Sequence, residues 1–336
     1  MTLEFAQNAV LKITSIPRNS QKRSSLASAF RNDMTSSSTV MISSNGNSLP
    51  LYDFWVELKD GYLDPILQLP ADYAESPIPI VIAHGLGMEP MKKNHRNDIT
   101  FDLWKDTISR FKRHHQTPCG EKFALLFTSR GHGDSIAKAE NDGTKNDDKI
   151  FYDNYRWPQL GKDLIEIARL HNANVNSNGY SFLPMIAFGQ SMGAASCLYA
   201  AMDQPNLFRG LILARLPRIW QDRANAKSGL VIQANEIQKQ KRNSKECLSH
   251  LPLLAAAGSD LPSDPGVYKT ITCPVLILSH GEDLTHPVSS AISISNLIPR
   301  VRLDYSAKNE LEARKLWPSI ISEWLFNEYF LSSNQS

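Results

Sequence analysis

The length, composition and charge of the chain exclude several classes of protein. Its 336 residues are 42% hydrophobic and 21% charged, which is typical of a globular protein and unlike a disordered or fibrous one. Lys and Arg number 36 against 34 Asp and Glu, so the net charge of +2 favours neither nucleic acid nor an anionic membrane as a partner. No apolar run approaches the roughly 18 residues that span a bilayer, and no integral membrane association is expected.

The N-terminal segment over 1–39 is predicted to lie outside the globular core. It is rich in Ser and in basic residues, which suits either an organelle-targeting peptide or a disordered or loosely docked extension. The cysteines lie far apart and match no metal or redox spacing: Cys119, Cys197, Cys247 and Cys273. Free thiols suit a reducing compartment. We therefore expect a cytoplasmic protein, with organelle targeting by residues 1–39 as the alternative.

From residue 40 the sequence predicts a hairpin and then an alternation of strands and helices. The hairpin strands cover 40–43 and 52–58 and are joined across Asn45-Gly46, a dipeptide that readily supplies positive φ. The hydrophobic periodicity predicts strands over 78–83, 123–127, 183–188, 210–213, 275–278 and 301–305, and helices over 101–111, 157–170, 192–202 and 311–329. Short buried strands separated by helices indicate an α/β fold with a mostly parallel sheet, helices on both faces and the hairpin at one edge.

One segment, residues 217–270, interrupts this alternation. It contains helical stretches and a turn-rich stretch between two predicted core strands, as a small helical cap insertion would. The chain is therefore divided into the extension over 1–39, a first part of the core over 40–216, the cap over 217–270 and a second part of the core over 271–336.

The pentapeptide Gly189-Gln190-Ser191-Met192-Gly193 joins a predicted strand directly to a predicted helix. A nucleophile elbow needs this context, because its serine stands in a strained turn above the sheet and its glycines let strand and helix approach closely. Ser191 is therefore the candidate nucleophile. The alternative is a serine in an ordinary strand-to-helix turn.

A second motif, His84-Gly85-Leu86-Gly87, ends the predicted strand over 78–83. Stabilising the oxyanion of a tetrahedral intermediate requires a backbone donor at this position, and the amides of Leu86 and Met192 are predicted to form the pair. His84 is interpreted as a structural residue that braces this loop. The alternative is a glycine-rich turn without a catalytic role.

The sequence Arg-Gly-His-Gly-Asp-Ser over 130–135 follows the next predicted strand. The motifs at 84–87, 130–135 and 189–193, in this order, resemble the α/β-hydrolase superfamily, and the resemblance spans about residues 40–330. Dinucleotide binding is not expected, because neither 85–87 nor 131–133 is followed by a third glycine at the required spacing.

The resemblance implies a triad, and here the sequence departs from the pattern. In the superfamily the acid follows the strand after the cap and the histidine follows the last strand. The loop over 306–310, after the last predicted strand, has no histidine, and the last histidine in the chain is His286, three residues after Asp283.

An Asp-x-x-His segment can fold as a β-turn, which brings the Cα atoms of its ends within about 7 Å. Asp283 is then able to orient His286 from the same loop, and Pro287 favours a helix that begins just after it. The positive end of that helix favours a neutral imidazole, as a general base requires. The alternative is that His286 only caps the helix and the site is incomplete.

Basic residues are concentrated near the start of the predicted cap. Residues 215–245 carry eight basic side chains against two acidic ones. They form either a solvated helix face or a clamp in which Arg215, Arg218 or Arg223 binds a substrate carboxylate. The segments 216–223, 283–289 and Trp317-Pro318 look like hydrolases related to 3-oxoadipate enol-lactonases, and an anionic substrate would suit that resemblance.

The predicted function is hydrolysis of a small-molecule carboxylic ester or lactone by Ser191, His286 and Asp283, without a cofactor. A hydrolase-fold binding protein with little turnover is the alternative from another class, and cleavage of a carbon–carbon bond is the alternative among enzymes. No metal is expected, since His114 and His115 point apart on a helix and no fourth ligand lies near them and Cys119. The sequence leaves the oligomeric state unknown.

Overall fold

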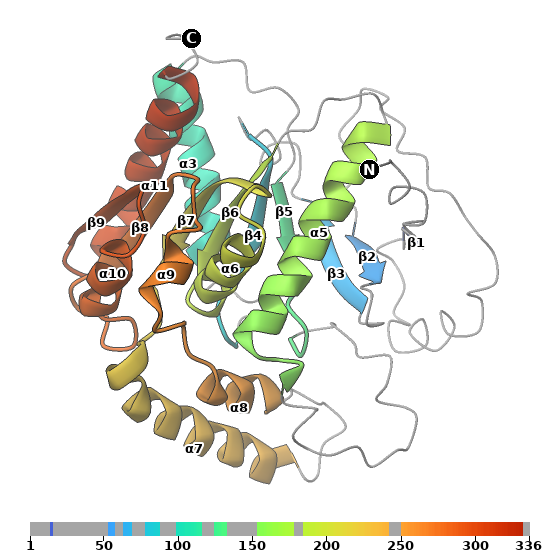
Figure 1. The fold of residues 1–336 in the computed structure, drawn as a ribbon, viewed down its shortest axis with the longest axis vertical. Coiled ribbons are helices and arrows are strands. Elements are labelled where there is room, and N and C mark those ends of the chain that lie inside the picture. The colour runs from blue at the N-terminus through green and yellow to red at the C-terminus, as the bar shows by residue number, and fades with distance from the viewer. Residues whose placement is uncertain are drawn as a thin grey trace.

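A computed structural model of the protein describes residues 14–15, 53–57, 63–68, 78–87, 99–115, 124–132, 153–177, 184–241 and 250–331. Within these residues one sheet forms the centre of the molecule (Figure 1). Its strands lie in the order β1-β2-β3-β5-β4-β6-β7-β8-β9. The prediction of a mostly parallel sheet is confirmed, because every neighbouring pair from β5 to β9 in this order is parallel. These strands are β4 (Ile80–Ala83), β5 (Ala124–Phe127), β6 (Met185–Gln190), β7 (Phe208–Ala214), β8 (Val275–His280) and β9 (Val301–Ala307).

The antiparallel edge differs from the predicted hairpin. The strand predicted over 52–58 is present as β2 (Asp53–Glu57), but it pairs with β3 (Leu63–Gln68), which the sequence did not predict. Proline argues against a central strand, yet Pro65 is tolerated in β3 because the ladder with β5 begins only at Ile66. The predicted partner strand over 40–43 and the Asn45-Gly46 turn lie outside the described residues.

A short strand also lies within the segment predicted as an extension. β1 (Thr14–Ser15) pairs antiparallel with β2, so these two residues add to the edge of the sheet.

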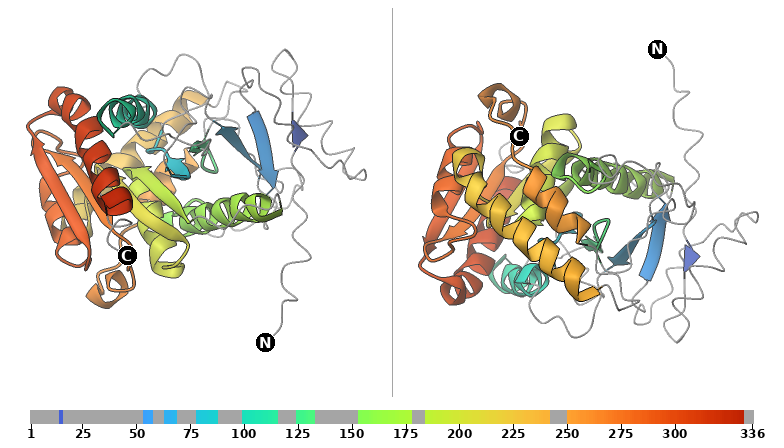
Figure 2. Two further views of the ribbon diagram at one scale, coloured as in Figure 1. Left: turned by 90° about the horizontal axis from the view of Figure 1, so that it is seen from above. Right: turned by 90° about the horizontal axis from the view of Figure 1, so that it is seen from below.

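Alternate residues of the parallel strands face two separate apolar layers, as the period of two in a strand requires. In β4, Val81 and Ala83 belong to one layer, whereas Ile80 and Ile82 belong to the other. The first layer is covered by α5, α6 and α10, and the second by α3 and α11 (Figures 1 and 2). These helices are α3 (Ile99–His115), α5 (Trp157–Ser177), α6 (Met192–Asp203), α10 (Val288–Ser295) and α11 (Glu310–Phe326), which continues as η3 (Asn327–Leu331).

The segment between β7 and β8 contributes helices of its own. Figure 1 shows α7 and α8 at one end of the sheet, away from the helices that cover its two faces. The short loop after the carboxyl end of β7 leads into this segment, so it lies at the edge where α/β folds place their sites. Its elements are η2 (Trp220–Asp222), α7 (Arg223–Lys241), α8 (Leu251–Gly258) and α9 (Pro265–Tyr268).

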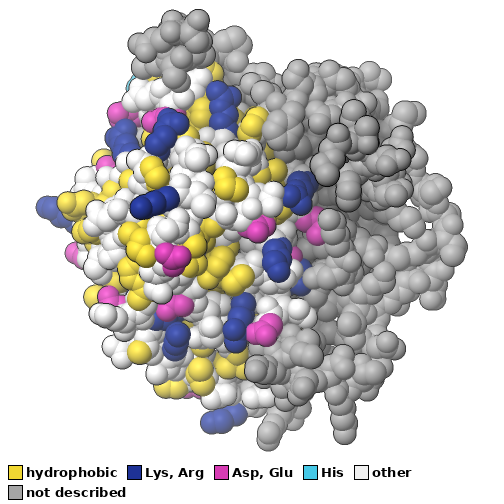
Figure 3. All heavy atoms as spheres, viewed as in Figure 1, with side chains coloured by type: hydrophobic (Ala, Val, Ile, Leu, Met, Phe, Trp, Pro, Cys, Tyr) yellow, Lys and Arg dark blue, Asp and Glu magenta, His cyan; other side chains and the backbone are white. Residues whose placement is uncertain are grey.

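The described surface carries charges of both signs. Figure 3 shows basic, acidic and apolar side chains interspersed over the described part of one face. This distribution fits the net charge of +2. Among the described residues, none of the helices has the length and apolar character that crossing a membrane requires.

Candidate active site

The turn between β6 and α6 holds Ser191 in an unusual backbone conformation. Its φ is 52° and its ψ is −112°, and a positive φ is uncommon for a residue other than glycine. The Ser191 amide donates a hydrogen bond of 3.0 Å to the Ala214 carbonyl at the end of β7, and the Ser191 carbonyl accepts one from Ala195 in α6. The hydrogen bonds to β7 and α6 therefore maintain the strained turn that the sequence predicts.

The two glycines of the pentapeptide are required by close backbone contacts. A Cβ on Gly193 would collide with the Ala83 carbonyl of β4, and a Cβ on Gly189 would collide with the backbone of Gly193. Helix α6 consequently begins directly against the sheet, and Ser191 stands at the carboxyl end of β6.

Three side chains meet at this turn. The His286 Nε2 atom lies 2.8 Å from the Ser191 Oγ atom, and His286 Nδ1 lies 3.0 Å from Asp283 Oδ2. The side chains of His286 and Asp283 are 14% and 12% exposed. A nucleophile, a base and an orienting acid in hydrogen-bond contact form the arrangement that activates a serine.

Asp283 and His286 reach this geometry through the turn between them. The second carboxylate oxygen, Oδ1, accepts hydrogen bonds from the backbone amides of Thr285 at 3.1 Å and His286 at 3.0 Å. Helix α10 then begins at Val288, directly after Pro287. The short loop thus supplies both residues that the sequence predicted as acid and base.

The environment of Asp283 keeps it ionised. Burial opposes ionisation, but the hydrogen bonds from His286, its charge and the charge of Arg215 outweigh burial and hold the pKa of Asp283 well below its usual range. His280 approaches the same carboxylate, with its Nε2 atom 3.5 Å from Oδ2. Burial is also the main cause that lowers the pKa of His280, followed by the charge of Arg215.

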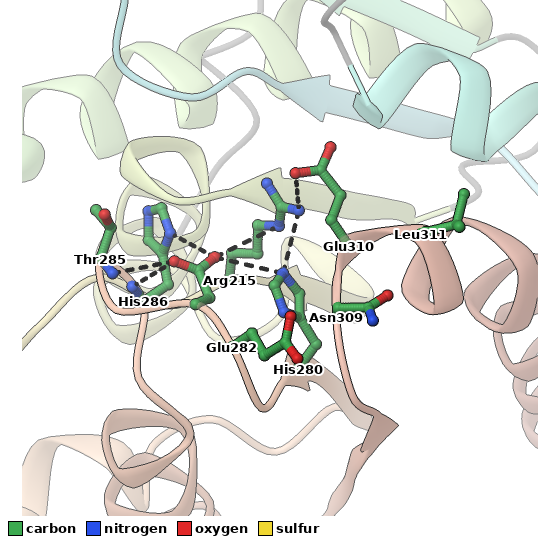
Figure 4. A pocket seen from close by; sticks show the side chains of 9 residues that line it. Arg215, His280, Glu282, Thr285, His286, Asn309, Glu310 and Leu311 are labelled. Carbon is green, nitrogen blue, oxygen red and sulfur yellow. Dashed lines mark hydrogen bonds and ion pairs between the residues drawn. The ribbon is translucent and has the colours of Figure 1, made fainter.

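Arg215, a predicted substrate clamp, lies beside this carboxylate with protein partners of its own. Its Nη2 atom is 3.2 Å from Glu310 Oε2 and 3.2 Å from His280 Nε2, and its Nε atom is 3.7 Å from Asp283 Oδ2 (Figure 4). Together with the β8–α10 loop and the start of α11, it lines a cavity of about 530 Å³.

The other two predicted clamp residues have different surroundings. Arg218 donates hydrogen bonds of 3.0 and 2.6 Å to the Leu284 carbonyl, in the loop between the acid and the base. Arg223 is buried, donates to the carbonyls of Ser259 and Ala256, and stacks on the Trp157 ring. Burial lowers the pKa of Arg223 to about 10, against the effect of the Asp260 charge. The structure therefore brings Arg218 to the site loop but not Arg223, whose guanidinium anchors the end of α8.

The residues predicted for the oxyanion hole follow neighbouring strands. Strands β4 and β6 pair with Ala83 opposite Gly189, so Leu86 and Met192 each lie three residues beyond this pair. Met192 is the first residue of α6, where backbone amides lack partners within the helix.

Two buried histidines brace the loop that carries Leu86. The His84 ring accepts a hydrogen bond of 2.9 Å from the Ser129 amide, and the Gly87 amide donates one of 3.2 Å to the His132 ring. Burial lowers the pKa of His84 to about 4, against the effect of its backbone hydrogen bond to Gly85. His84 is therefore neutral near pH 7. Its hydrogen bond from Ser129 agrees with the sequence interpretation that His84 is a structural residue bracing this loop.

The sequence reasoning missed His280 and Glu310. Glu310 belongs to the loop that was noted only for its lack of a histidine, and His280 is the last residue of β8. A signal for Glu310 was present, because an acid at the start of a predicted helix faces the end of neighbouring parallel strands. His280 carries no comparable signal.

Comparison with solved structures identifies the architecture. An esterase from Exiguobacterium antarcticum is similar with a TM-score of 0.55 and 14% identity, over 81% of this chain and 98% of the esterase. A hydrolase from Pseudomonas aeruginosa is similar with a TM-score of 0.53 and 14% identity, over 85% of this chain and 99% of the hydrolase. The chain has the α/β-hydrolase fold.

Further comparisons agree with this fold. Est1E from Butyrivibrio proteoclasticus, in a structure with bound ferulic acid, is similar with a TM-score of 0.50 and 13% identity, over 82% of this chain and 98% of Est1E. The chain matches no family model and no curated protein. In this fold Ser191 directly follows β6, Asp283 lies three residues after β8, and Glu310 lies three residues after β9.

Proposed function

We propose that this α/β-hydrolase cleaves a carboxylic ester or lactone through an acyl-enzyme formed on Ser191. The observation that carries the proposal is the continuous hydrogen-bond chain from Ser191 Oγ through His286 to Asp283, at a serine with positive φ. The resemblance to enol-lactonase-related hydrolases supports a lactone or an activated ester as substrate. The structural similarity to an esterase from Exiguobacterium antarcticum is consistent with this reaction class.

The proposed reaction proceeds in two steps. The Ser191 oxygen attacks the ester carbonyl while His286 Nε2 takes its proton, and the amides of Leu86 and Met192 stabilise the oxyanion. His286 then gives the proton to the leaving alkoxide. Water, activated by the same histidine, hydrolyses the acyl-enzyme and regenerates Ser191. Asp283 holds the imidazole in the required tautomer throughout.

The residues of the cap region are proposed to cover this site. Residues 217–270 follow β7 at its carboxyl end, and α8 and α7 lie beyond that end of the sheet. The cap would therefore shape the space over Ser191 and select the acyl or leaving group.

A fluorophosphonate probe and p-nitrophenyl esters test the proposal. We expect Ser191→Ala to abolish labelling and to lower kcat/KM by at least about a thousandfold, with a similar loss for His286→Ala and no further loss in the double variant, because triad members act as one unit. Ser228→Ala, on the exposed side of α7, is the matched control and should label like the parent.

Two outcomes oppose the proposal. An unlabelled parent protein would favour a binding protein that keeps the fold without turnover. Labelling that survives Ser191→Ala, or is lost in His84→Ala but not in His286→Ala, would show that the nucleophile or the base is wrongly assigned.

A further inference from the structure

Arg215 lies where three parts of the site meet. It follows the last residue of β7 with a φ of 53°, and its amide donates a hydrogen bond of 2.9 Å to the Leu278 carbonyl of β8. A positive φ in a residue with a long side chain is strained. This conformation places the Arg215 side chain beside the carboxylate of Asp283. The Arg215 side chain is 11% exposed.

The guanidinium and the proposed catalytic histidine share one oxygen of that carboxylate. Asp283 Oδ2 accepts the hydrogen bond from His286 Nδ1 at 3.0 Å and lies 3.7 Å from Arg215 Nε. Figure 4 shows the Arg215 guanidinium beside Glu310 and His280, at 3.2 Å from each. Arg215 is thus able to fix the orientation of the acid that contacts His286.

Glu310 in turn is held from several directions. It is the first residue of α11, and the side chain of the N-cap residue Asn309 accepts a hydrogen bond from the Glu312 amide. The Oε1 atom of Glu310 accepts hydrogen bonds from Arg314, which leaves Oε2 to contact Arg215 at 3.2 Å. Position and orientation of the Glu310 carboxylate are therefore both set by α11.

The loop that carries Glu310 is also tied to the loop that carries the acid. The amides of Gly281 and Glu282 donate hydrogen bonds of 3.1 and 2.9 Å to the carbonyls of Ala307 and Lys308. Movement of the β9–α11 loop relative to Asp283 is restricted by these contacts.

We propose that Arg215 and Glu310 form a positioning pair, in which Glu310 holds the Arg215 guanidinium against Asp283 and thereby keeps the acid aligned with His286. The inference rests on the proposed function. The loop after the last strand, where the superfamily carries its histidine, then contributes to the same triad through an ion pair. Arg215 is a positioning residue and not a substrate clamp.

Arg215 and Glu310 have opposite electrostatic effects on the titratable groups around them. His280 from β8, Asp283 and Glu282 from the next loop and Glu310 from α11 surround the guanidinium and the cavity beside it. Burial and then the charge of Arg215 lower the pKa of His280, whereas the charge of Glu310 raises it.

Steady-state kinetics of Arg215→Met, Glu310→Gln and the double variant test the pair. We expect each single variant to lower kcat by roughly ten- to a hundredfold, with KM within about twofold of the parent, because misaligned groups slow the chemical step. The double variant should be no slower than the slower single variant.

The matched control is the ion pair of Arg302 in β9 with Glu323 in α11, which has the same separation of 3.2 Å and is exposed. Arg302→Met and Glu323→Gln should leave both kcat and KM unchanged. Arg215→Lys keeps the charge and should recover part of the activity, which separates positioning from misfolding, and thermal unfolding of each variant checks the fold.

Several results would overturn the pair. Losses that multiply in the double variant would show that Arg215 and Glu310 act independently, and a raised KM at constant kcat would make Arg215 a substrate clamp. Unchanged kcat in both single variants, with a parent that labels at Ser191, would reject the pair alone. A parent that does not label with fluorophosphonate would reject the proposed function and the pair with it.

Discussion

At the scale of single residues, the proposed site depends on one short turn that brings acid and base together. The Asp283 carboxylate binds the amides of Thr285 and His286 with one oxygen and the His286 ring with the other. The acid therefore stabilises the loop and orients the base at the same time. A histidine placed three residues after its acid is therefore able to reach Ser191 from the loop after β8.

A substrate carboxylate is predicted to be bound by Arg218. The prediction named three arginines, but Arg223 is buried and donates to backbone carbonyls, and Arg215 is paired with Glu310. Arg218 is half-buried and contacts the Leu284 carbonyl of the site loop. We expect kcat/KM to favour an ester that bears a carboxylate over its neutral amide analogue by about ten- to a hundredfold.

Arg218→Met should remove this preference, and Arg209→Met, outside the site loop, should keep it. Equal rates on the charged and neutral analogues at low salt would show that the positive charge of the segment over 215–245 has no role in substrate choice.

At the scale of elements, the contact between α6 and β4 determines where Ser191 stands. Gly193→Ala should destabilise the protein by roughly 3 kcal/mol, because the new methyl group meets the Ala83 carbonyl and neither backbone can move without disturbing the sheet. Gly229→Ala is the matched control, since Gly229 lies within α7 with open space around it. That change should stabilise by about 0.5 to 1 kcal/mol.

Urea unfolding followed by circular dichroism measures both changes. A Gly193→Ala protein as stable as the parent would mean that α6 can shift away from β4. A changed rate of fluorophosphonate labelling would then show that Ser191 has moved.

The same elements show what the sequence was able to predict. The parallel strands and their helices were recognisable because β-branched runs and helical periodicity are local properties, and Asp283 and His286 were recognisable because they share one loop. Strand β3 was missed because Pro65 argues against a strand unless its partner ladder is known. The contact between Arg215 and Glu310 joins residues far apart in the chain, and no local pattern predicts it. The position of the Arg223 side chain likewise depends on how α8 packs, which no local pattern predicts.

At the scale of the whole molecule, the buried histidine His84 couples stability to pH. It is fully buried between the loops that follow β4 and β5, and burial lowers its pKa from 6.5 to about 4. The unfolded chain therefore binds a proton more readily than the folded protein below pH 6.5. The resulting contribution to stability is fully present above that pH and is lost progressively as the pH falls toward 4.

We expect the free energy of unfolding to fall by about 3 kcal/mol between pH 7 and pH 4 through this residue, in addition to the effects of other groups. His84→Gln, whose amide oxygen is able to accept the hydrogen bond from Ser129, should make the pH dependence shallower by that amount. His114→Gln, on the exposed end of α3, should retain the dependence of the parent. Urea unfolding at pH 7 and at pH 4 measures this fall in the free energy of unfolding. An identical fall for the parent and His84→Gln would show that the protonated His84 is accommodated in the folded protein.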